Sequence, residues 1–238
     1  MKTEWNGADA LGVVGGMGPL ASAEFLKTIY ERSLGRREQD SPRVFLYSDP
    51  TVPDRTEALL RGSYEELLES LTTALRKLHE MGAARTVICC VTIHGLLPRL
   101  PPALGERVIS LIEVIFAEVE RSRERHLLVC TTGTRELGIF EGHRRWPALK
   151  EFIVLPDEGD QAGLHEWIYR VKLRCDPEAL VPFLESLLVK YRVDSFIAGC
   201  TEMHLLARRL LSRGRGPSDF GCIDPLTIIA RGLAGDSK

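Results

Sequence analysis

Two cysteines of this chain each end an apolar run that is typical of a buried strand. Cys90 closes the run TVICC, Cys200 closes SFIAGC, and a threonine follows each cysteine within two residues. Parallel strands bring their carboxyl ends to one edge of a sheet, where α/β proteins bind ligands. A thiolate can act as a base or as a nucleophile. The spacing therefore predicts two thiols that face one another across a substrate.

The other cysteines are expected to have no chemical role. Side chains alternate between the two faces of a strand, so Cys89 is expected to point away from the face of Cys90. Cys200 and His204 form half of a metal-binding pattern, but no second pair of ligands stands nearby in the sequence. We therefore expect neither a metal site nor a disulfide framework. Core packing is the expected role of Cys89, Cys130, Cys175 and Cys222.

The order of the predicted elements is that of an α/β protein. Short apolar runs alternate with longer amphipathic segments, such as those at 63–82 and 111–123. This alternation indicates mostly parallel sheets flanked by helices. The expected strands lie at 10–16, 43–48, 86–90, 126–132, 152–155, 195–200 and 220–223.

The pattern of elements is also duplicated. VVGGMGPLAS opens the first half and VCTTGTRELG the second, and VICCVTIH is answered by FIAGCTEM. We expect two similar lobes, each a mostly parallel sheet flanked by helices, related by pseudo-two-fold symmetry with the active site in the cleft between them. The expected first lobe covers residues 1–104 and the second covers 105–213, while residues 214–238 are expected to pack back onto the first lobe.

The glycine loop at 16–21 fits the G-x-G-x-x-A pattern of dinucleotide-binding proteins. Such proteins place an acidic residue at the end of the next strand to bind the ribose, but Asp49 lies too far along this chain. We therefore expect no nicotinamide cofactor. Backbone N–H groups at a helix N-terminus can still bind an anion such as a carboxylate.

Composition and charge argue against several classes of partner. The 238 residues are 44% hydrophobic and 27% charged, with a formal net charge of -2. A nearly neutral chain does not favour nucleic acid. The sequence has no apolar stretch of about 18 residues that could span a membrane, and its first residues lack the apolar segment of a signal peptide. We expect a cytoplasmic protein that binds neither nucleic acid nor membranes.

Six motifs occur in an order that resembles one known family. They are GVVGGMGPLAS, DPTVPDRT, the Cys-x-Thr-x-His segment at 90–94, TTGT, IYRVKL and GCTEM. Together they resemble the cofactor-independent aspartate/glutamate racemases, and the aspartate racemase branch most closely. The resemblance implies an isomerase that acts on aspartate or glutamate without PLP or any other cofactor. It further implies two-base proton transfer between Cys90 and Cys200, and a homodimer.

The resemblance also implies roles for individual residues. Arg55 in PDRT and Lys172 in IYRVKL match cationic positions that hold acidic substrates, and arginine suits a bidentate grip on a carboxylate. Thr92, Thr134 and Thr201 match positions that donate hydrogen bonds to the substrate carboxylate. The further positions that match the family are Met17 and Glu202, as substrate contacts, and His94.

The segment after the first cysteine departs from the family pattern. The family has Cys-Asn-Thr there, whereas this chain has Cys90-Val91-Thr92. The asparagine amide bonds the substrate and valine cannot, so Val91 is expected either to reshape the pocket or to weaken the activity. Two alternatives stay open. One is a cis-trans isomerase of the maleate isomerase type, with cysteine as the nucleophile, and the other is a catalytically impaired amino-acid-binding homologue.

Overall fold

The computed structural model describes residues 9–35, 37–173, 176–212 and 220–234. In these residues the strands form two four-stranded sheets, in which all neighbouring strands are parallel. The first sheet contains β1 (Ala10–Gly15), β2 (Arg43–Ser48), β3 (Ala83–Ile88) and β4 (Val108–Ile109), and the second contains β5 (His126–Val129), β6 (Ile153–Val154), β7 (Ser195–Ala198) and β8 (Gly221–Ile223). Their orders are β2-β1-β3-β4 and β6-β5-β7-β8. The two orders correspond strand by strand, so the predicted duplication is confirmed.

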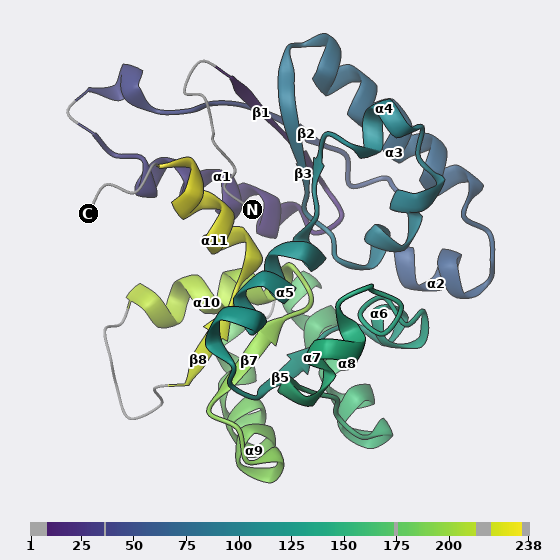
Figure 1. Cartoon of the computed structure of the whole chain (residues 1–238), viewed down its shortest axis with the longest axis vertical. Helices are drawn as coiled ribbons and strands as arrows, with labels where there is room; N and C mark the ends of the chain where they lie inside the picture. The colour runs from purple at the N-terminus through teal and green to yellow at the C-terminus, as the bar shows by residue number, and fades with distance from the viewer. Residues whose placement is uncertain (1–8, 36, 174–175, 213–219, 235–238) are drawn as a thin grey trace.

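Helices join successive strands and lie against the sheets (Figure 1). Figure 1 shows the first sheet in the upper half of the molecule and the second in the lower half, with α1, α5, α10 and α11 between them. The helices are α1 (Pro19–Arg32), α2 (Arg55–Leu60), α3 (Glu65–Glu80), α4 (Pro102–Gly105), α5 (Leu111–Ser122), α6 (Thr132–Glu136), α7 (Trp146–Leu149), α8 (Glu158–Leu173), α9 (Val181–Tyr191), α10 (Glu202–Ser212) and α11 (Pro225–Leu233), and the 3-10 helix η2 covers Thr92–Arg99.

The central strands are apolar because both of their faces are covered. All residues of β1, β5 and β7 are buried. Near-continuous apolar runs of this kind occur where helices pack on both faces of a parallel sheet. One apolar cluster continues from the first lobe into the second, and it includes Leu11 of β1, Phe116 of α5 and Ile197 of β7. The two lobes therefore share a core.

The division between the lobes differs in detail from the sequence expectation. β4 pairs with β3, so the first sheet continues past residue 104 to Ile109. β8 pairs with β7 and therefore belongs to the second sheet. α11, by contrast, packs against α1 of the first lobe and against α5. The last described strand thus completes the second sheet, and the helix after it crosses to the first lobe.

A buried hydrogen-bond network fixes this crossing. The Nδ1–H of His204 on α10 donates to Oδ2 of Asp224 at 2.6 Å, and His204 Nε2 lies 3.1 Å from Oγ1 of Thr28 on α1. Asp224 also accepts from the hydroxyl of Thr227 on α11 at 2.6 Å. All four side chains are buried. The network therefore ties together three helices in a low-dielectric environment, where hydrogen bonds are strong and a missing partner is costly.

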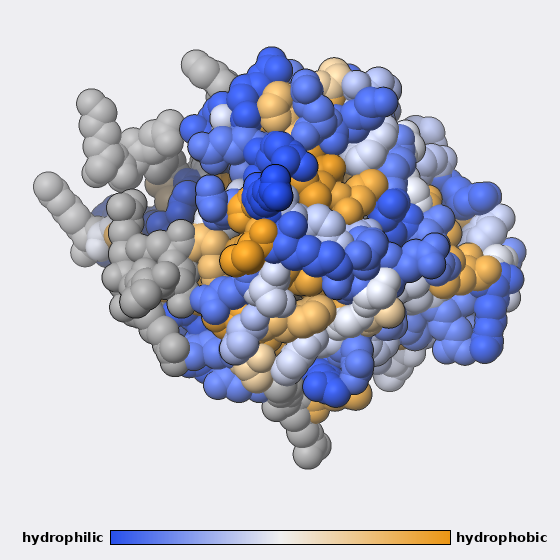
Figure 2. All heavy atoms as spheres, turned by 90° about the horizontal axis from the view of Figure 1, so that it is seen from below, coloured by the Kyte–Doolittle hydropathy of each residue, from blue (hydrophilic) through white to orange (hydrophobic). Residues whose placement is uncertain are grey.

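The exterior is mixed in polarity. Figure 2, which views the molecule from below, shows a mainly hydrophilic face with apolar areas between the polar side chains. Large exposed apolar side chains include Leu34, Leu173 and Val189, which stand far apart in the sequence. Single exposed apolar residues are ordinary on folded domains. Within the described ranges, no helix combines the length and the apolar character needed to cross a membrane.

Replacing Asp224 by asparagine is expected to destabilise the fold strongly. The change deprives His204 and Thr227 of their carboxylate acceptor in a buried site, and breaking a buried pair costs roughly 3–5 kcal/mol. Guanidinium unfolding at pH 7 measures the loss. Asp157→Asn is the matched control, because Asp157 pairs with Lys190 at the surface. We expect that control to leave the free energy of unfolding nearly unchanged.

The contribution of Asp224 should also depend on pH. Burial alone would raise the pKa of this carboxyl, but His204 and the hydroxyl of Thr227 hold the pKa below its ordinary value. A carboxyl group whose pKa is lowered in the folded state stabilises the fold at pH values above its unfolded-state pKa of about 4. That stabilisation is lost as the pH falls through the folded-state pKa. Wild type should therefore lose stability more steeply than Asp224→Asn below about pH 4, and equal slopes would contradict the assignment.

Candidate active site

Each candidate cysteine follows a strand at which the order of strand addition in its sheet reverses. The chain first adds β2 on one side of β1 and then β3 on the other, so the loops after β1 and β3 diverge and leave a crevice. Cys90 lies two residues after β3, and Cys200 lies two residues after β7. The two cysteines therefore occupy corresponding places in the duplicated sheets, at the edge where open α/β sheets bind ligands.

Burial distinguishes Cys89 from Cys90. Cys89 is fully buried in the central apolar cluster, and burial raises the pKa of its thiol far above the ordinary value. Cys90 is 7% exposed and packs in a different cluster, with Met17 and Ile93. The two neighbours thus face opposite sides, as strand alternation predicts. Cys130 is buried, Cys222 is partly exposed, and Cys175 lies outside the described residues.

The chain holds Arg55 in place through main-chain carbonyls. Arg55 is the first residue of α2, directly after the N-cap Asp54. Its Nη1 donates to the carbonyls of Val52 and Pro53, at 3.3 and 3.1 Å. Its Nη2 donates to the carbonyl of Met17 at 3.1 Å. The guanidinium is therefore fixed between the loop that follows β1 and the loop that precedes α2.

Two half-buried cations lie among the acidic groups of the site. Burial alone would lower the pKa of Arg55, but interactions with Cys90 and with carboxylates such as Glu202 raise that pKa above its ordinary value. Lys172 behaves in the same way, because Glu202, Cys200 and Cys90 outweigh its burial and raise its pKa. The structure therefore brings both predicted cations, both predicted cysteines and Glu202 into one electrostatic cluster.

Lys172 enters this cluster from the second lobe. Its Nζ lies 4.4 Å from the ring centroid of Tyr169, which is a cation–π contact. The Tyr169 hydroxyl donates to Oδ2 of Asp54 at 2.7 Å. Asp54 in turn accepts from the N–H of Glu57 and so caps α2. One chain of contacts thus positions the helix that carries Lys172 relative to the helix that carries Arg55.

Cys200 has a carboxyl group as its partner. Its Sγ–H donates to Oε2 of Glu202 at 2.7 Å. Burial and the Glu202 carboxylate raise the pKa of this thiol well above its ordinary value, against the opposing effect of Lys172. Cys200 is therefore a protonated thiol at neutral pH. The surroundings of the two cysteines differ, since a guanidinium lies beside Cys90 and a carboxyl group beside Cys200.

The three threonines implied by the resemblance have hydrogen-bond partners in the protein. The Oγ1 atoms of Thr92 and Thr134 are 2.8 Å apart, which links η2 to α6 across the lobes. Thr131 caps α6 and lies within hydrogen-bond distance of both hydroxyls. Thr201 donates to the main-chain carbonyl of Cys89 at 3.2 Å. Contact of these threonines with a substrate stays a prediction.

His94 fixes the backbone at Cys90. Its Nε2 accepts from the N–H of Leu111 at 3.1 Å, so Nδ1 carries the proton and donates to the carbonyl of Cys90 at 2.8 Å. Burial lowers the pKa of this imidazole to about 4. His94 is therefore neutral at neutral pH with both nitrogens engaged, which makes it a positioning residue.

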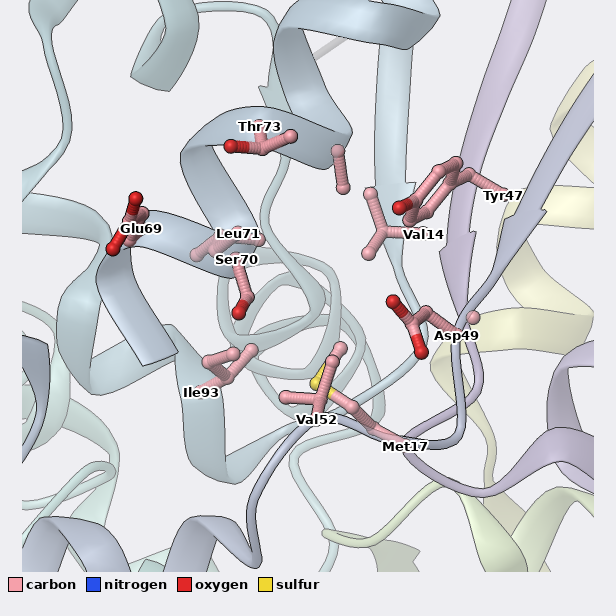
Figure 3. A pocket seen from close by; sticks show the side chains of 12 residues that line it. Val14, Met17, Tyr47, Asp49, Val52, Glu69, Ser70, Leu71, Thr73 and Ile93 are labelled. Carbon is pink, nitrogen blue, oxygen red and sulfur yellow. The ribbon is translucent and has the colours of Figure 1, made fainter. Parts of the chain in front are cut away.

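Val91 and Met17 differ in their surroundings. Val91 is 1% exposed and packs in the central apolar cluster, where an apolar side chain is required; a substrate contact for it stays a prediction. Met17 lines a cavity of about 240 Å³ in the first lobe, into which Asp49 points (Figure 3). The lining of this cavity includes neither Cys90 nor Cys200. The cavity therefore neighbours the cysteine site at Met17 and is separate from it.

Close packing accounts for the glycines of the loop that follows β1. A Cβ on Gly16 would lie 2.3 Å from the main chain of Asp49. A Cβ on Gly18 would lie 2.2 Å from Oε1 of Glu202. Both glycines have a positive φ, +91° and +145°, which disfavours other residues. In the ranges that the structure describes, no three His, Cys, Asp or Glu side chains are grouped as a metal site.

Sequence reasoning missed two residues that organise the site, Asp54 and Tyr169. Asp54 precedes a short helix, where aspartate is a favoured N-cap. Tyr169 stands three residues before Lys172 and so shares a helix face with it. Both local signals were available in the sequence. Their hydrogen bond joins residues 115 positions apart, and no local pattern predicts such a pairing.

A sequence model of the family described as Asp/Glu/Hydantoin racemase matches residues 14–232. This chain belongs to that family. The family resemblance that the motifs predicted is confirmed, and the chain is thereby placed among the racemases.

Solved structures of several racemases share the fold. The aspartate racemase of Picrophilus torridus matches with a TM-score of 0.78 and 23% identity, over 95% of this chain and 94% of that one. The glutamate racemase of Aquifex pyrophilus matches with 0.56 and 19%, over 94% and 81%. The allantoin racemase of Klebsiella pneumoniae matches with 0.52 and 15%, over 95% and 86%. The three names differ in substrate, so the shared fold does not identify the substrate of this family member.

The charge of the site should be measurable by alkylation of the cysteines. Iodoacetate is an anion and iodoacetamide is neutral, so the ratio of their rates at one thiol reports the local potential. Lys172→Met removes one cation that interacts with Cys90 and Cys200, and we expect this ratio to fall several-fold at Cys90. Peptide mass mapping gives the rates. The partly exposed Cys222 is the internal control, and an unchanged ratio at Cys90 would contradict the electrostatic cluster.

Proposed function

We propose that this protein interconverts the enantiomers of an acidic amino acid, aspartate first, by two-base proton transfer between Cys90 and Cys200. The observation that carries the proposal is the placement of the two cysteines. They occupy corresponding positions of the duplicated sheets, and both interact with Lys172. Pseudo-two-fold symmetry is the arrangement that presents two like groups to opposite faces of one substrate carbon. The family of racemases to which the chain belongs supports the reaction type.

The chemistry needs two proton-transferring groups. One cysteine, as a thiolate, removes the α-proton from one face of the substrate, and the other, as a thiol, returns a proton to the opposite face. The positive charges of Arg55 and Lys172 suit the two carboxylates of aspartate or glutamate. The thiols themselves are the bases, so the proposed reaction requires no PLP and no nicotinamide.

The unequal surroundings of the two thiols favour different roles for them in proton transfer. Cys200 is protonated beside Glu202 and is ready to deliver a proton. Cys90 lies beside Arg55, whose charge suits a thiolate partner. The resting form therefore holds Cys200 as the proton donor, and an enantiomer whose α-proton faces Cys90 needs Cys90 as the base. One turnover converts it to the opposite form, and the thiols must exchange protons to reset.

Incubation of each aspartate enantiomer in deuterium oxide tests the proposed reaction. A racemase produces the opposite enantiomer with deuterium on the α-carbon, as chiral chromatography and mass spectrometry will detect. Conversion of maleate to fumarate without such exchange would instead identify a cis-trans isomerase. Binding of aspartate without exchange would identify an amino-acid-binding homologue. Either of these results would overturn the racemase proposal.

Serine at either cysteine should nearly abolish racemisation. A hydroxyl is a much weaker acid than a thiol, so Cys90→Ser and Cys200→Ser should each lower kcat by at least roughly 10²–10⁴-fold. Residual exchange of the α-hydrogen should favour opposite enantiomers in the two variants, because each keeps one thiol. Cys89→Ser is the control and should retain most activity, since Cys89 faces the core. Wild-type rates in both single variants would rule out the two-thiol reaction.

Lys172→Met should impair acidic substrates far more than neutral ones. Loss of one charge-assisted contact costs roughly 1.5–3 kcal/mol, or about ten- to a hundredfold in kcat/KM for aspartate. Lys172 gives a cleaner test than Arg55, because Arg55 also holds three carbonyls of the surrounding loops. Lys190→Met, at an exposed surface pair, is the matched control. Equal losses for aspartate and alanine would show that Lys172 does not bind the side-chain carboxylate.

A further inference from the structure

Glu202 presents a buried oxygen atom without a partner. The side chain is 2% exposed, and its Oε2 accepts from the thiol of Cys200. Its Oε1 is fully buried and has no hydrogen-bond partner among the described residues. Oε1 lies against Gly18, where a Cβ would be only 2.2 Å from it. The absence of a side chain at Gly18 thus leaves room for an acceptor that no donor among the described residues satisfies.

An unpaired buried carboxylate oxygen is unfavourable, because it has lost its hydration without gaining a donor. Arg55 and Lys172 balance the charge of Glu202 electrostatically, but neither donates a hydrogen bond to Oε1. A positively charged donor from a ligand would satisfy this atom. A second carboxylate in the same place would instead be repelled.

The position of the orphaned oxygen indicates which part of a ligand it meets. Glu202 contacts the thiol of Cys200 directly. A carbon atom that exchanges a proton with that thiol must approach its sulfur closely, so the substituents of the same carbon lie near the Glu202 carboxyl group. The α-carbon of an amino acid carries one cationic donor, the ammonium group.

We propose that Oε1 of Glu202 accepts a hydrogen bond from the α-ammonium group of the substrate, an inference that rests on the proposed racemase function. Glu202 is then the residue that selects amino acids over dicarboxylates that lack the ammonium group. By keeping this group protonated, the carboxylate also retains a positive charge next to the carbon on which negative charge develops. Gly18 contributes by leaving the room that Oε1 itself needs, since a Cβ there would lie 2.2 Å from this oxygen.

Binding of two ligands that differ only at the α-substituent tests the inference. Calorimetry gives the dissociation constants of racemic aspartate and of succinate, and the racemate is used so that turnover does not change the ligand. Wild type should prefer aspartate by roughly ten- to a hundredfold, the worth of a charge-assisted hydrogen bond. In Glu202→Gln this preference should largely disappear. Glu69→Gln, an exposed carboxylate on α3, should keep the wild-type preference.

Two measurements make the outcome decisive. Glu202→Asp withdraws the carboxylate by one methylene group and should give an intermediate preference for aspartate. This variant takes the place of Glu202→Gln if the Gln variant does not fold. An unchanged preference for aspartate over succinate in the folded variant would overturn the inference. If that variant had also lost deuterium exchange, Glu202 would act on the Cys200 thiol and not on the ammonium group. If wild type prefers aspartate through Glu202 but exchanges no deuterium, the ammonium site stands and the racemase proposal falls.

Discussion

The charge balance among Arg55, Lys172 and Glu202 is the constraint on which this site depends. Glu202 is buried, and Arg55 and Lys172 are half-buried; charges withdrawn from water in this way are costly unless opposite charge compensates them. Glu202 supplies that compensation for both cations, and Asp54 adds to it at Arg55. The two cations come from different lobes, so the balance exists only when the lobes are packed together. Assembly of the fold and assembly of the charged site are therefore one event.

Directional hydrogen bonds across the junction give this cluster its geometry. The Tyr169–Asp54 bond places α8 against α2. The bond from Thr201 to the carbonyl of Cys89 joins the two cysteine loops. Because these bonds are directional, they fix where the side chains lie, whereas the charges alone would only attract. Rigid support of this kind is what a site needs if two groups must act on a single atom.

The sequence predicts the fold and the cysteines well because both depend on local patterns. Apolar runs and helical periodicity place the strands, and the strand ends place Cys90 and Cys200. It predicts the contacts of the site less well, since the approach of Gly18 to Glu202 links distant loops. Val91 shows the other limit: the family pattern indicates a pocket position, but the neighbouring core determines its packing. The sequence also does not show to which lobe the last described strand, β8, belongs. Its pairing with β7 is a long-range contact that only the structure reveals.

The unequal surroundings of the two cysteines have a consequence for the duplicated architecture. In a symmetric dimer of two half-length chains, every residue would occur twice, and both cysteines would have identical neighbours. Within one continuous chain each half can carry its own substitutions, so a guanidinium lies beside one thiol and a carboxyl group beside the other. Covalent fusion of the halves is therefore the step that allows symmetric scaffolds to hold an asymmetric pair of proton carriers.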